Sequence, residues 1–307
     1  MSPFRGILCK VLSVSLFTMM AVMIKASADE VPPGEAVFFR SFFAIPVILG
    51  WLAWTGDMRH GLDTSYPIGH FWRGFAGTTA MGLGFTAMGL LPLPEATAIG
   101  YAAPLLTVVF AAMFLGEEVR IFRLTAVFLG LVGVLVVLSP RLTVAHPGEV
   151  SQLQTLGAMA GLLGAVFAAL AQVFVRKLVH TEATAAIVFY FSVTSALLAL
   201  LTLPFGWAVP SLPGAMQLIA AGLLGGVGQI LLTEAYRAAP ASVVAPFEYV
   251  SMLLAILFGF AIFAEVPTRR TLAGAGLIVA AGLFILWRER KLGLQRAAAR
   301  GAVTPQG

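Results

Sequence analysis

The chain has 307 residues, of which 59% are hydrophobic and only 11% are charged, and its mean hydropathy is +0.94. A soluble domain of this length needs far more charge to cover its surface, so the composition predicts an integral membrane protein. The net charge of +5 invites a nucleic-acid partner, but the basic residues are spread over connecting segments, which argues against that function. The single cysteine, Cys9, excludes an internal disulfide.

Ten stretches are apolar and long enough to cross a bilayer as helices, since a hydrocarbon core of roughly 30 Å takes about 20 residues. These predicted spans are 6–26, 36–54, 71–91, 94–115, 121–139, 155–175, 183–203, 213–235, 242–264 and 271–287. Their connections are short and leave no room for a soluble domain. The expected fold class is therefore an all-α membrane protein with ten transmembrane helices.

The first stretch resembles a secretory signal peptide, because a basic start and an apolar run precede Ala26, Ser27 and Ala28. Lys25 lies directly before this cleavage-like site, where signal peptides are normally uncharged. We therefore predict that residues 6–26 stay in the protein as its first span.

The basic residues favour one side of the membrane. With the N-terminus placed inside, the inner segments carry Arg5, Arg59, Arg120, Arg123, Arg176, Lys177, Arg237, Arg288, Arg290, Lys291, Arg296 and Arg300. The outer loops then carry only Arg141, Arg269 and Arg270. This bias predicts a multi-pass protein with both termini in the cytoplasm and a basic cytoplasmic tail over residues 288–307.

The chain also contains an internal repeat. Residues 23–49 align with 174–200 at an offset of 151, and residues 91–119 align with 237–266. The matched pairs are Lys25 with Arg176, Val37 with Val188, Phe38 with Phe189, Ser41 with Ser192, Pro94 with Pro240, Tyr101 with Phe247 and Glu118 with Glu265. Each copy holds five spans, an odd number, so the second copy enters the membrane from the opposite side. We predict two inverted repeats, 6–139 and 155–287, with a solute site where they face each other.

These features resemble one known family. The segments that carry the resemblance are "VFFRSFF" around Arg40, "LPLPEATAIGYAAPLLTVVFAAMFLGEEV" from residue 91, and "AAPASVVAPFEYVSMLLAILFGFAIFAEVP" from residue 238. The chain is similar to the EamA branch of the drug/metabolite transporter superfamily, over residues 6–287. The resemblance implies a secondary transporter of the bacterial inner membrane. It points to a subgroup with riboflavin importers and S-adenosylmethionine uptake carriers, so riboflavin uptake is the first expectation. S-adenosylmethionine uptake and export of amino acids or other metabolites are the alternatives.

Glu248 is an ionisable residue inside the predicted ninth span, about 9–10 Å from its start at 1.5 Å per residue. A charged group near the bilayer centre costs roughly 2.5–3.5 kcal/mol, so it should face a partner or a wet cavity. Pro246, two residues earlier, has no N–H and leaves the carbonyl of Ser242 without its helical partner. We predict that Glu248 binds solute and is the candidate proton-coupling site. A structural hydrogen bond to a neighbouring helix is the alternative.

Several basic residues lie inside or beside the spans. Arg40 is open to three interpretations: it snorkels to the interface, it holds Glu35, or it binds a carboxylate or carbonyl of the solute. Lys25 either snorkels or binds solute, and Arg73 is interpreted in the same way. Lys10 is expected to be an anchor at the inner interface.

Two acidic positions are expected to be structural. Glu234 lies three residues before Arg237 in the eighth span, which permits a local ion pair. Glu118 and Glu265 end equivalent spans of the two repeats, so both are expected to cap a helix or pair with a nearby arginine.

Tyr101 and Tyr249 lie beside the proline breaks of the fourth and ninth spans, where their rings could stack on a flat solute. Gln172 and Gln229 are uncharged polar residues inside the sixth and eighth spans and could line the same cavity. We predict all four as solute-binding residues. The other aromatic residues are expected to pack in the core or face lipid.

Two other function classes have little support in the sequence. The four histidines lie in or beside loops, and no metalloprotease motif or nucleophile elbow is present, which argues against an enzyme. No filter-like loop indicates a channel. The expected partners are a small-molecule solute and the lipid bilayer. We expect no cofactor, metal or nucleic acid, and a homodimer stays open.

Overall fold

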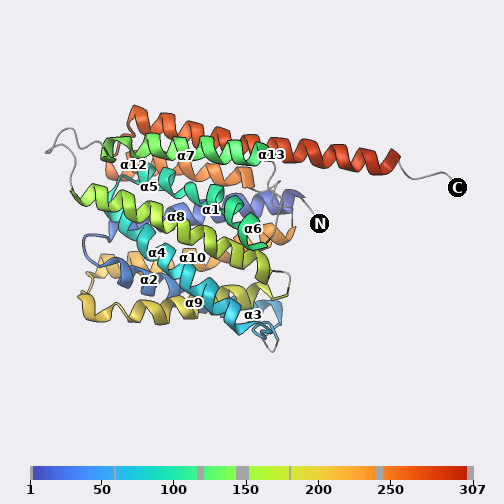
Figure 1. The fold of residues 1–307 in the computed structure, drawn as a ribbon. Helices are drawn as coiled ribbons and strands as arrows, with labels where there is room; N and C mark the ends of the chain where they lie inside the picture. The colour runs from blue at the N-terminus through green and yellow to red at the C-terminus, as the bar shows by residue number, and fades with distance from the viewer. Residues whose placement is uncertain are drawn as a thin grey trace.

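The computed structural model describes residues 3–58, 60–115, 121–142, 152–179, 181–238 and 245–302. These residues form a bundle of helices without a strand (Figure 1). The first half contains α1 (Pro3–Ala26), α2 (Pro33–Phe42), α3 (Ala44–Thr55), α4 (Pro67–Leu90), α5 (Leu93–Gly100), α6 (Ala102–Leu115) and α7 (Ile121–Leu142). The second half contains α8 (Gln152–Leu178), α9 (Thr184–Leu200), η1 (Leu203–Phe205), α10 (Leu212–Ala238), η2 (Ala245–Tyr249), α12 (Val250–Phe263) and α13 (Arg269–Ala302).

All ten predicted spans correspond to helices of this bundle. Three of them are broken: the second is α2 with α3, the fourth is α5 with α6, and the ninth is η2 with α12. Among the described residues, four segments are long and apolar enough to cross a membrane, namely Phe4–Ala26, Pro33–Thr55 with its break between α2 and α3, Gln152–Val175 and Leu212–Ala235. The remaining spans are shorter, broken or more polar. Residues 242–244 of the ninth predicted span lie outside the described part.

Prolines explain two of the breaks. A proline inside a helix cannot donate to the carbonyl four residues earlier, and its ring clashes with that carbonyl. Pro46 follows the last residue of α2, Phe42, by four positions, and Pro104 follows the last residue of α5, Gly100, by the same spacing. The chain therefore ends one helix and starts another inside the membrane span. In the fourth span this break leaves Tyr101 between two helices.

Helices of one half pack mainly against helices of the other half. The most extensive contacts join α1 with α10, α4 with α8 and α7 with α13. The repeat equates α1 with α8 and α4 with α10, so the contact between α1 and α10 maps onto the contact between α8 and α4. The pairs α2 with α9 and α7 with α13 map onto themselves, as helices beside a two-fold axis must. The fold is thus two inverted five-helix repeats, as predicted.

The two halves meet through small residues. Gly222 and Gly226 of α10 lie against Phe43 and Ala44 of the first half, and Gly161 of α8 lies against Ile99. A Cβ atom at any of these glycines would press on its neighbour, so glycine permits the close approach of the helices. The glycine-rich stretches are therefore packing surfaces between the repeats.

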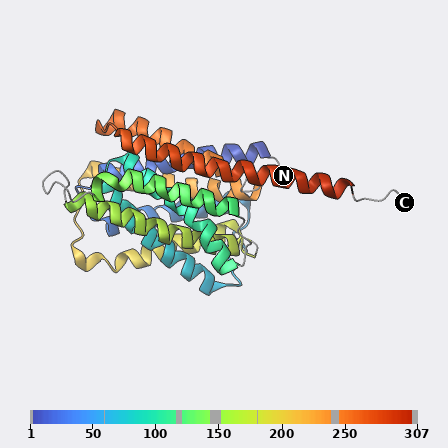
Figure 2. The same cartoon turned by 45° about the horizontal axis from the view of Figure 1, so that its top comes forward.

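The helices of the bundle end at two opposite faces. The N-face is the side on which α1 begins, and α13 continues past the bundle on that side (Figures 1 and 2). The opposite face contains the end of α1 at Ala26 and the turn from α4 to α5. The predicted cytoplasmic tail begins inside α13, which extends to Ala302, and residues 303–307 lie outside the described part.

Candidate functional site

An ion pair lies inside the bundle at the start of the ninth span. Lys10 of α1 donates from its Nζ to Oε2 of Glu248 in η2. The Lys10 side chain is 1% exposed and the Glu248 side chain is 39% exposed. The pair therefore has one partner enclosed by protein and one that faces open space. The prediction that Lys10 is an interfacial anchor is wrong, because its amine is buried against a carboxylate.

The position of this pair follows from the topology. The first and ninth spans run in the same direction in an inverted repeat, and α1 packs against both η2 and α12. Lys10 lies seven residues after the first residue of α1, about 10 Å into the helix at 1.5 Å per residue. Glu248 lies at a similar depth in the ninth span. Lys10 and Glu248 therefore lie at equal depth on neighbouring parallel helices. This match of opposite charges is the signal in the sequence that identifies Lys10 as the partner of Glu248.

Two tyrosines and a serine complete the cluster around Glu248. The Ser251 hydroxyl donates to the carbonyl of Glu248 at 2.7 Å and is hydrogen-bonded to the Tyr101 hydroxyl. The rings of Tyr101 and Tyr249 meet edge to face, with centroids 5.3 Å apart. The 3₁₀ turn of η2 leaves the Glu248 carbonyl available to these hydroxyls, because it is not part of a regular α-helical ladder. The structure thus brings together the predicted residues Glu248, Tyr249 and Tyr101.

We call Lys10, Glu248, Tyr101, Tyr249 and Ser251 the broken-helix cluster. It presents an ammonium group, a partly exposed carboxylate and two aromatic rings within one region. A solute with opposite charges can exchange partners with such an ion pair without leaving either protein charge uncompensated. The aromatic edges can pack on a flat part of the same molecule.

A second ion pair lies at the opposite face. Lys25 Nζ lies 3.0 Å from Oε1 of Glu265 and donates to the carbonyls of Met88 at 3.0 Å and Leu91 at 2.6 Å. Oε2 of Glu265 accepts from the backbone N–H of Leu93 at 2.7 Å, which caps the start of α5. Lys25 therefore does not snorkel to the interface. The capping role predicted for Glu265 is confirmed, and the equivalent Glu118 lies outside the described residues.

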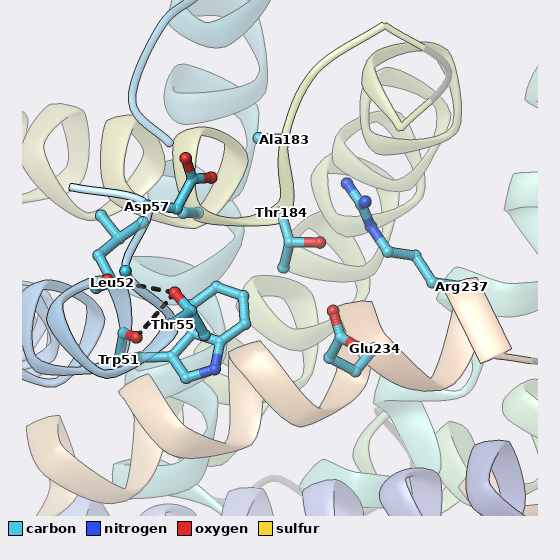
Figure 3. Close-up of a pocket in the computed structure, with 10 residues that line it drawn as sticks. Trp51, Leu52, Thr55, Asp57, Ala183, Thr184, Glu234 and Arg237 are labelled. Atoms are coloured by element: carbon cyan, nitrogen blue, oxygen red, sulfur yellow. Dashed lines mark hydrogen bonds between the residues drawn. The ribbon is translucent and has the colours of Figure 1, made fainter. Parts of the chain in front are cut away.

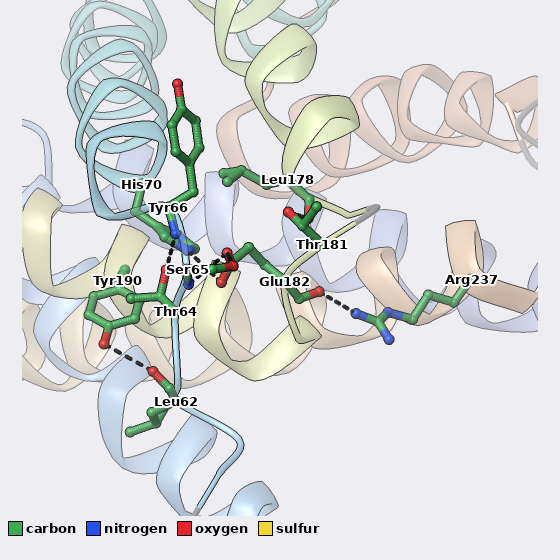
Figure 4. Close-up of polar contacts among 10 residues, drawn as sticks. All are labelled: Leu62, Thr64, Ser65, Tyr66, His70, Leu178, Thr181, Glu182, Tyr190 and Arg237. Carbon is green, nitrogen blue, oxygen red and sulfur yellow. Dashed lines mark hydrogen bonds and ion pairs between the residues drawn. The ribbon is translucent and has the colours of Figure 1, made fainter.

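Contacts at the N-face differ from the prediction for Glu234. Glu234 pairs with Arg5 at 3.7 Å, and Arg237 Nη2 donates to the carbonyl of Glu182 at 3.0 Å (Figure 4). The local ion pair predicted between Glu234 and Arg237 is therefore not formed. Glu234 and Arg237 each bind a partner that is distant in the sequence, because α10 ends against both α1 and the turn before α9.

The turn before α9 contains a buried hydrogen-bond network (Figure 4). Glu182 accepts from the Ser65 backbone N–H at 3.1 Å and from the Ser65 hydroxyl at 3.0 Å, and its Oε2 lies 3.3 Å from Nε2 of His70. Burial alone raises the pKa of Glu182, but the hydrogen bonds from His70, Ser65 and Thr64 outweigh it and hold the pKa below its ordinary value. This network fastens the start of α4 to the turn before α9.

A cavity of about 480 Å³ opens beside this network, between α3, α9 and α10 (Figure 3). The side chains of Thr184, Glu234 and Arg237 turn toward one another across it (Figure 3). None of its lining residues belongs to the broken-helix cluster. The cavity is therefore separate from the buried ion pair.

The remaining predicted site residues lie apart from the cluster. Arg40 of α2 is 3% exposed, and its guanidinium lies 5.3 Å from the ring centroid of Phe191, so it neither snorkels nor bonds Glu35. Glu35 instead accepts from the backbone N–H of Ala208 at 3.0 Å. Gln172 is exposed on α8, and Gln229 is half-buried on α10. Their binding of solute stays a prediction.

Of the two interpretations of Arg73, the one in which it snorkels to the interface is wrong, and its contact with solute stays a prediction. Arg73 is 6% exposed, and its guanidinium lies 3.6 Å from the centroid of the same Phe191 ring. The signal in the sequence was weak, because Arg73 lies near the start of its span and snorkelling is common there.

Two inverted repeats with broken helices at their interface are the architecture of a secondary transporter. The chain belongs to the EamA-like transporter family, whose model matches residues 4–139 and 155–287. It is 29% identical over 290 residues, 94% of each chain, to a protein of Rickettsia prowazekii named "S-adenosylmethionine uptake transporter". It is 32% identical over 284 residues, 90% of this chain and 94% of the relative, to the "Pseudopaline exporter CntI" of Pseudomonas aeruginosa. A solved crystal structure with 22% sequence identity has the same fold, with a TM-score of 0.68 over 95% of this chain and 99% of that chain.

Proposed function

We propose that the protein is a secondary carrier for small zwitterionic metabolites of the S-adenosylmethionine type, and that the solute binds at the broken-helix cluster. The observation that carries the proposal is the ion pair of the buried Lys10 and the partly exposed Glu248 beside two tyrosine rings. S-adenosylmethionine carries a carboxylate, an ammonium group, a sulfonium cation and an adenine ring. In the cluster, Lys10 is a counterpart for the carboxylate, Glu248 for the cationic groups, and the two tyrosines for the ring. The relatives named for S-adenosylmethionine uptake support the same solute class.

The binding mode follows from the charges. The solute carboxylate takes the place of Glu248 beside Lys10, and the solute cation binds Glu248 on its exposed side. Charge-assisted hydrogen bonds of this kind contribute about 1.5–3 kcal/mol each. The adenine ring packs on the edges of Tyr101 and Tyr249. Ser251 holds both the Glu248 carbonyl and the Tyr101 hydroxyl, so it positions the cluster for this exchange.

A cationic solute meets less charge repulsion at the cluster than the basic residues in the sequence suggest. Lys25, Arg40 and Arg73 would repel a sulfonium if their charges were free. Lys25 is neutralised by Glu265, and both arginines lie away from the broken-helix cluster. Riboflavin, which has no fixed charge in its ring system, makes less use of an ion pair, and the relatives named above are named for other solutes. Riboflavin therefore enters as a competitor in the test.

The proposal includes an orientation and a coupling site. The N-face is cytoplasmic in the bacterial inner membrane, according to the distribution of arginine and lysine. Glu248 is the candidate proton carrier, because it is the member of the buried ion pair that reaches open space. Arg40, Lys25, Gln229 and Gln172 are secondary candidates for contact with solute in other conformations.

Export is the second candidate, because the relative from Pseudomonas aeruginosa is named as an exporter. A carrier with a symmetric repeat works in either direction, and the gradient of solute and coupling ion decides the net flow. Uptake and export are separated by loading solute on one side of the membrane only.

The test is transport of radiolabelled S-adenosylmethionine into proteoliposomes, with and without a pH gradient. We expect saturable uptake that unlabelled amino acids inhibit more strongly than riboflavin does. Glu248→Gln should lower kcat/KM by about 10- to 100-fold, which is the loss of about 1.4–3 kcal/mol. Glu234→Gln is the matched control, because it removes a carboxylate from an ion pair on the N-face outside the cluster.

Folding must be separated from function, since Glu248→Gln leaves the Lys10 ammonium buried alone. The double variant Lys10→Met with Glu248→Gln removes both charges and restores stability without restoring uptake. Uptake at the wild-type rate by this double variant would refute the proposed site. Accumulation that is independent of the pH gradient in the wild type would remove the proton-coupling role of Glu248.

A further inference from the structure

Two arginines and a phenylalanine form a stack in the interior of the bundle. Arg40 of α2 and Arg73 of α4 both lie against the ring of Phe191 in α9, with Cζ atoms 5.3 Å and 3.6 Å from the ring centroid. The exposed fractions of the two arginines are 3% and 6%, and that of Phe191 is 3%. Two like charges therefore share one aromatic ring in a place closed to bulk water.

Among the described residues, neither guanidinium forms an ion pair with a carboxylate. Nε and Nη1 of both guanidiniums are buried and have no hydrogen-bond acceptor within the described chain. The charge that acts on Arg73 is that of Arg40, which repels it. Glu35, the carboxylate five residues before Arg40 on α2, accepts from the backbone N–H of Ala208.

The aromatic ring is too weak a partner to offset this burial. A guanidinium keeps its proton in proteins, so it cannot neutralise itself. A cation over an aromatic face gains less than enclosing an unpaired ion costs, and here one ring serves two cations. Donors aimed at no acceptor indicate that an acceptor binds there in the loaded protein.

The stack lies beside the two-fold axis that relates the repeats. At the offset of 151, Arg40 is equivalent to Phe191 and Ser41 is equivalent to Ser192. Equivalent residues that touch must lie near the axis, and in inverted repeats the axis lies in the midplane of the membrane. Ser41 and Ser192 are fully buried, and the hydroxyls of both have no hydrogen-bond partner within the described residues. The two serines follow Arg40 and Phe191 directly in the chain, so they lie at the level of the same axis, and the donor atoms named above have no acceptor among the described residues.

Two glycines make room for the guanidiniums. A Cβ atom at Gly77 of α4 would overlap Nη1 of Arg73, and one at Gly225 of α10 would lie 3.1 Å from Nε of Arg40. A side chain at either position would press on an arginine, so the two glycines let the helix backbone approach both guanidiniums closely. The helices are shaped around the charged groups, which argues that the arginines are placed there for a purpose.

We propose that Arg40 and Arg73 form an anion-binding site between the two repeats, which takes a small monovalent anion such as chloride or a carboxylate group. The anion bridges the two guanidiniums and accepts from the hydroxyls of Ser41 and Ser192 as the helices adjust. It joins α2 and α4 of the first repeat to α9 of the second. This site is separate from the broken-helix cluster and does not depend on the proposed solute.

The test uses the full chain in nanodiscs of phosphatidylcholine, which carries no net charge. Thermal unfolding is compared in chloride and in the bulky sulfonate buffer anion MES at equal ionic strength. We expect chloride to raise the Tm of the wild type by about 3 °C or more in a saturable way, because a ligand that binds only the folded state stabilises it. Binding of radioactive chloride measured by equilibrium dialysis gives the stoichiometry, which we expect to be one per chain.

Variants assign the site to the two arginines. Arg40→Gln and Arg73→Gln should each abolish the chloride response and chloride binding. In MES they should unfold at or above the Tm of the wild type, because each removes an unpaired buried charge. Arg5→Gln is the control, since Arg5 is 69% exposed and should leave the response unchanged. Where a glutamine variant does not purify, the lysine variant keeps the charge but loses the planar stack, and its chloride affinity should fall about tenfold or more.

The outcomes are distinct. Acetate that displaces chloride with similar affinity identifies a carboxylate site, and displacement only by halides identifies an inorganic anion site. A wild-type Tm that does not change with the anion, together with no bound chloride or acetate, would overturn the proposal. So would glutamine variants that respond like the wild type. No transported solute is added, so failure of S-adenosylmethionine uptake and failure of anion binding are observed independently.

Discussion

The ion pair between Lys25 and Glu265 should hold the opposite face of the carrier closed. Lys25 bonds Glu265 and two carbonyls at the end of α4, while Glu265 also caps α5, so the pair joins the first, third, fourth and ninth spans. Glu265→Gln keeps the shape of the side chain and an oxygen for the Leu93 N–H. It removes the negative charge that Lys25 requires. We expect this substitution to favour opening of the opposite face.

The magnitude follows from the burial of the pair. The side chains of Lys25 and Glu265 are only 11% and 17% exposed, so water does not screen their interaction well. Loss of a charge-assisted hydrogen bond costs about 1.5–3 kcal/mol. A loss of about 2 kcal/mol from the closed state raises the population of the open state about 30-fold, since 1.4 kcal/mol corresponds to a factor of ten.

Labelling of a buried cysteine measures this population. Ala255 of α12 is fully buried in a cluster with Val22 and Leu93, near the ion pair of Lys25 and Glu265. In a Cys9→Ser background, Ala255→Cys should react with a membrane-impermeant maleimide only when the opposite face opens. We expect the Glu265→Gln substitution to raise the labelling rate by about 30-fold, in line with the population shift.

A control on the same face makes the result specific. Glu30 is an exposed carboxylate that accepts from the backbone and hydroxyl of Ser211, and Glu30→Gln should leave the labelling rate within twofold of the parent. An unchanged rate in a folded, monodisperse Glu265→Gln protein would show that the pair does not control access. The reasoning about the closed face would then be wrong.

Two further predictions concern local contacts. A Cβ atom at Gly282 of α13 would overlap the Tyr249 hydroxyl, so Gly282→Ala should displace this ring and reduce uptake at least tenfold, whereas Gly276→Ala on the same helix meets open space and should transport normally in the same assay. The pKa of Glu182 lies below its ordinary value, so its hydrogen bonds with His70 and the Ser65 turn stabilise the fold fully above about pH 4.5 and are lost as the pH falls through the lowered pKa. Glu182→Gln should therefore lower the Tm at neutral pH and flatten its decline on the acid side, and a Tm curve parallel to the wild type between pH 3 and 7 would contradict this.

The spans and their breaks could be predicted from the sequence because each rests on local chemistry. An apolar run of membrane length forms a helix in lipid, and a proline removes a particular backbone hydrogen bond. Pro104 acts on residues close to it in the chain, so the break beside Tyr101 can be inferred without knowledge of the packing. The repeat then places α1 beside the ninth span, since matching segments in inverted halves exchange their neighbours.

The burial and the partner of each charged side chain could not be predicted in the same way. Lys10 near the start of α1 and Arg73 near the start of α4 look like residues that reach the interface. Whether they do so depends on the helix that covers them, and that helix is far away in the sequence. Glu248 covers Lys10, and Phe191 covers Arg73. Local periodicity contains no information about these partners.

The two lysines of α1 suggest how the carrier avoids opening both faces at once. Lys10 and Lys25 are about 22 Å apart along α1 at 1.5 Å per residue, and their partners Glu248 and Glu265 lie at the two ends of the ninth span. Separating α1 from the ninth span at either end therefore breaks one ion pair and leaves a buried lysine uncompensated, at a cost of several kcal/mol. A solute whose carboxylate replaces Glu248 beside Lys10 removes that cost at the N-face, while the ion pair of Lys25 with Glu265 stays intact. We therefore expect a single substitution in either pair to let protons leak across the membrane when no solute is present, which is measured as the decay of an imposed pH gradient in proteoliposomes.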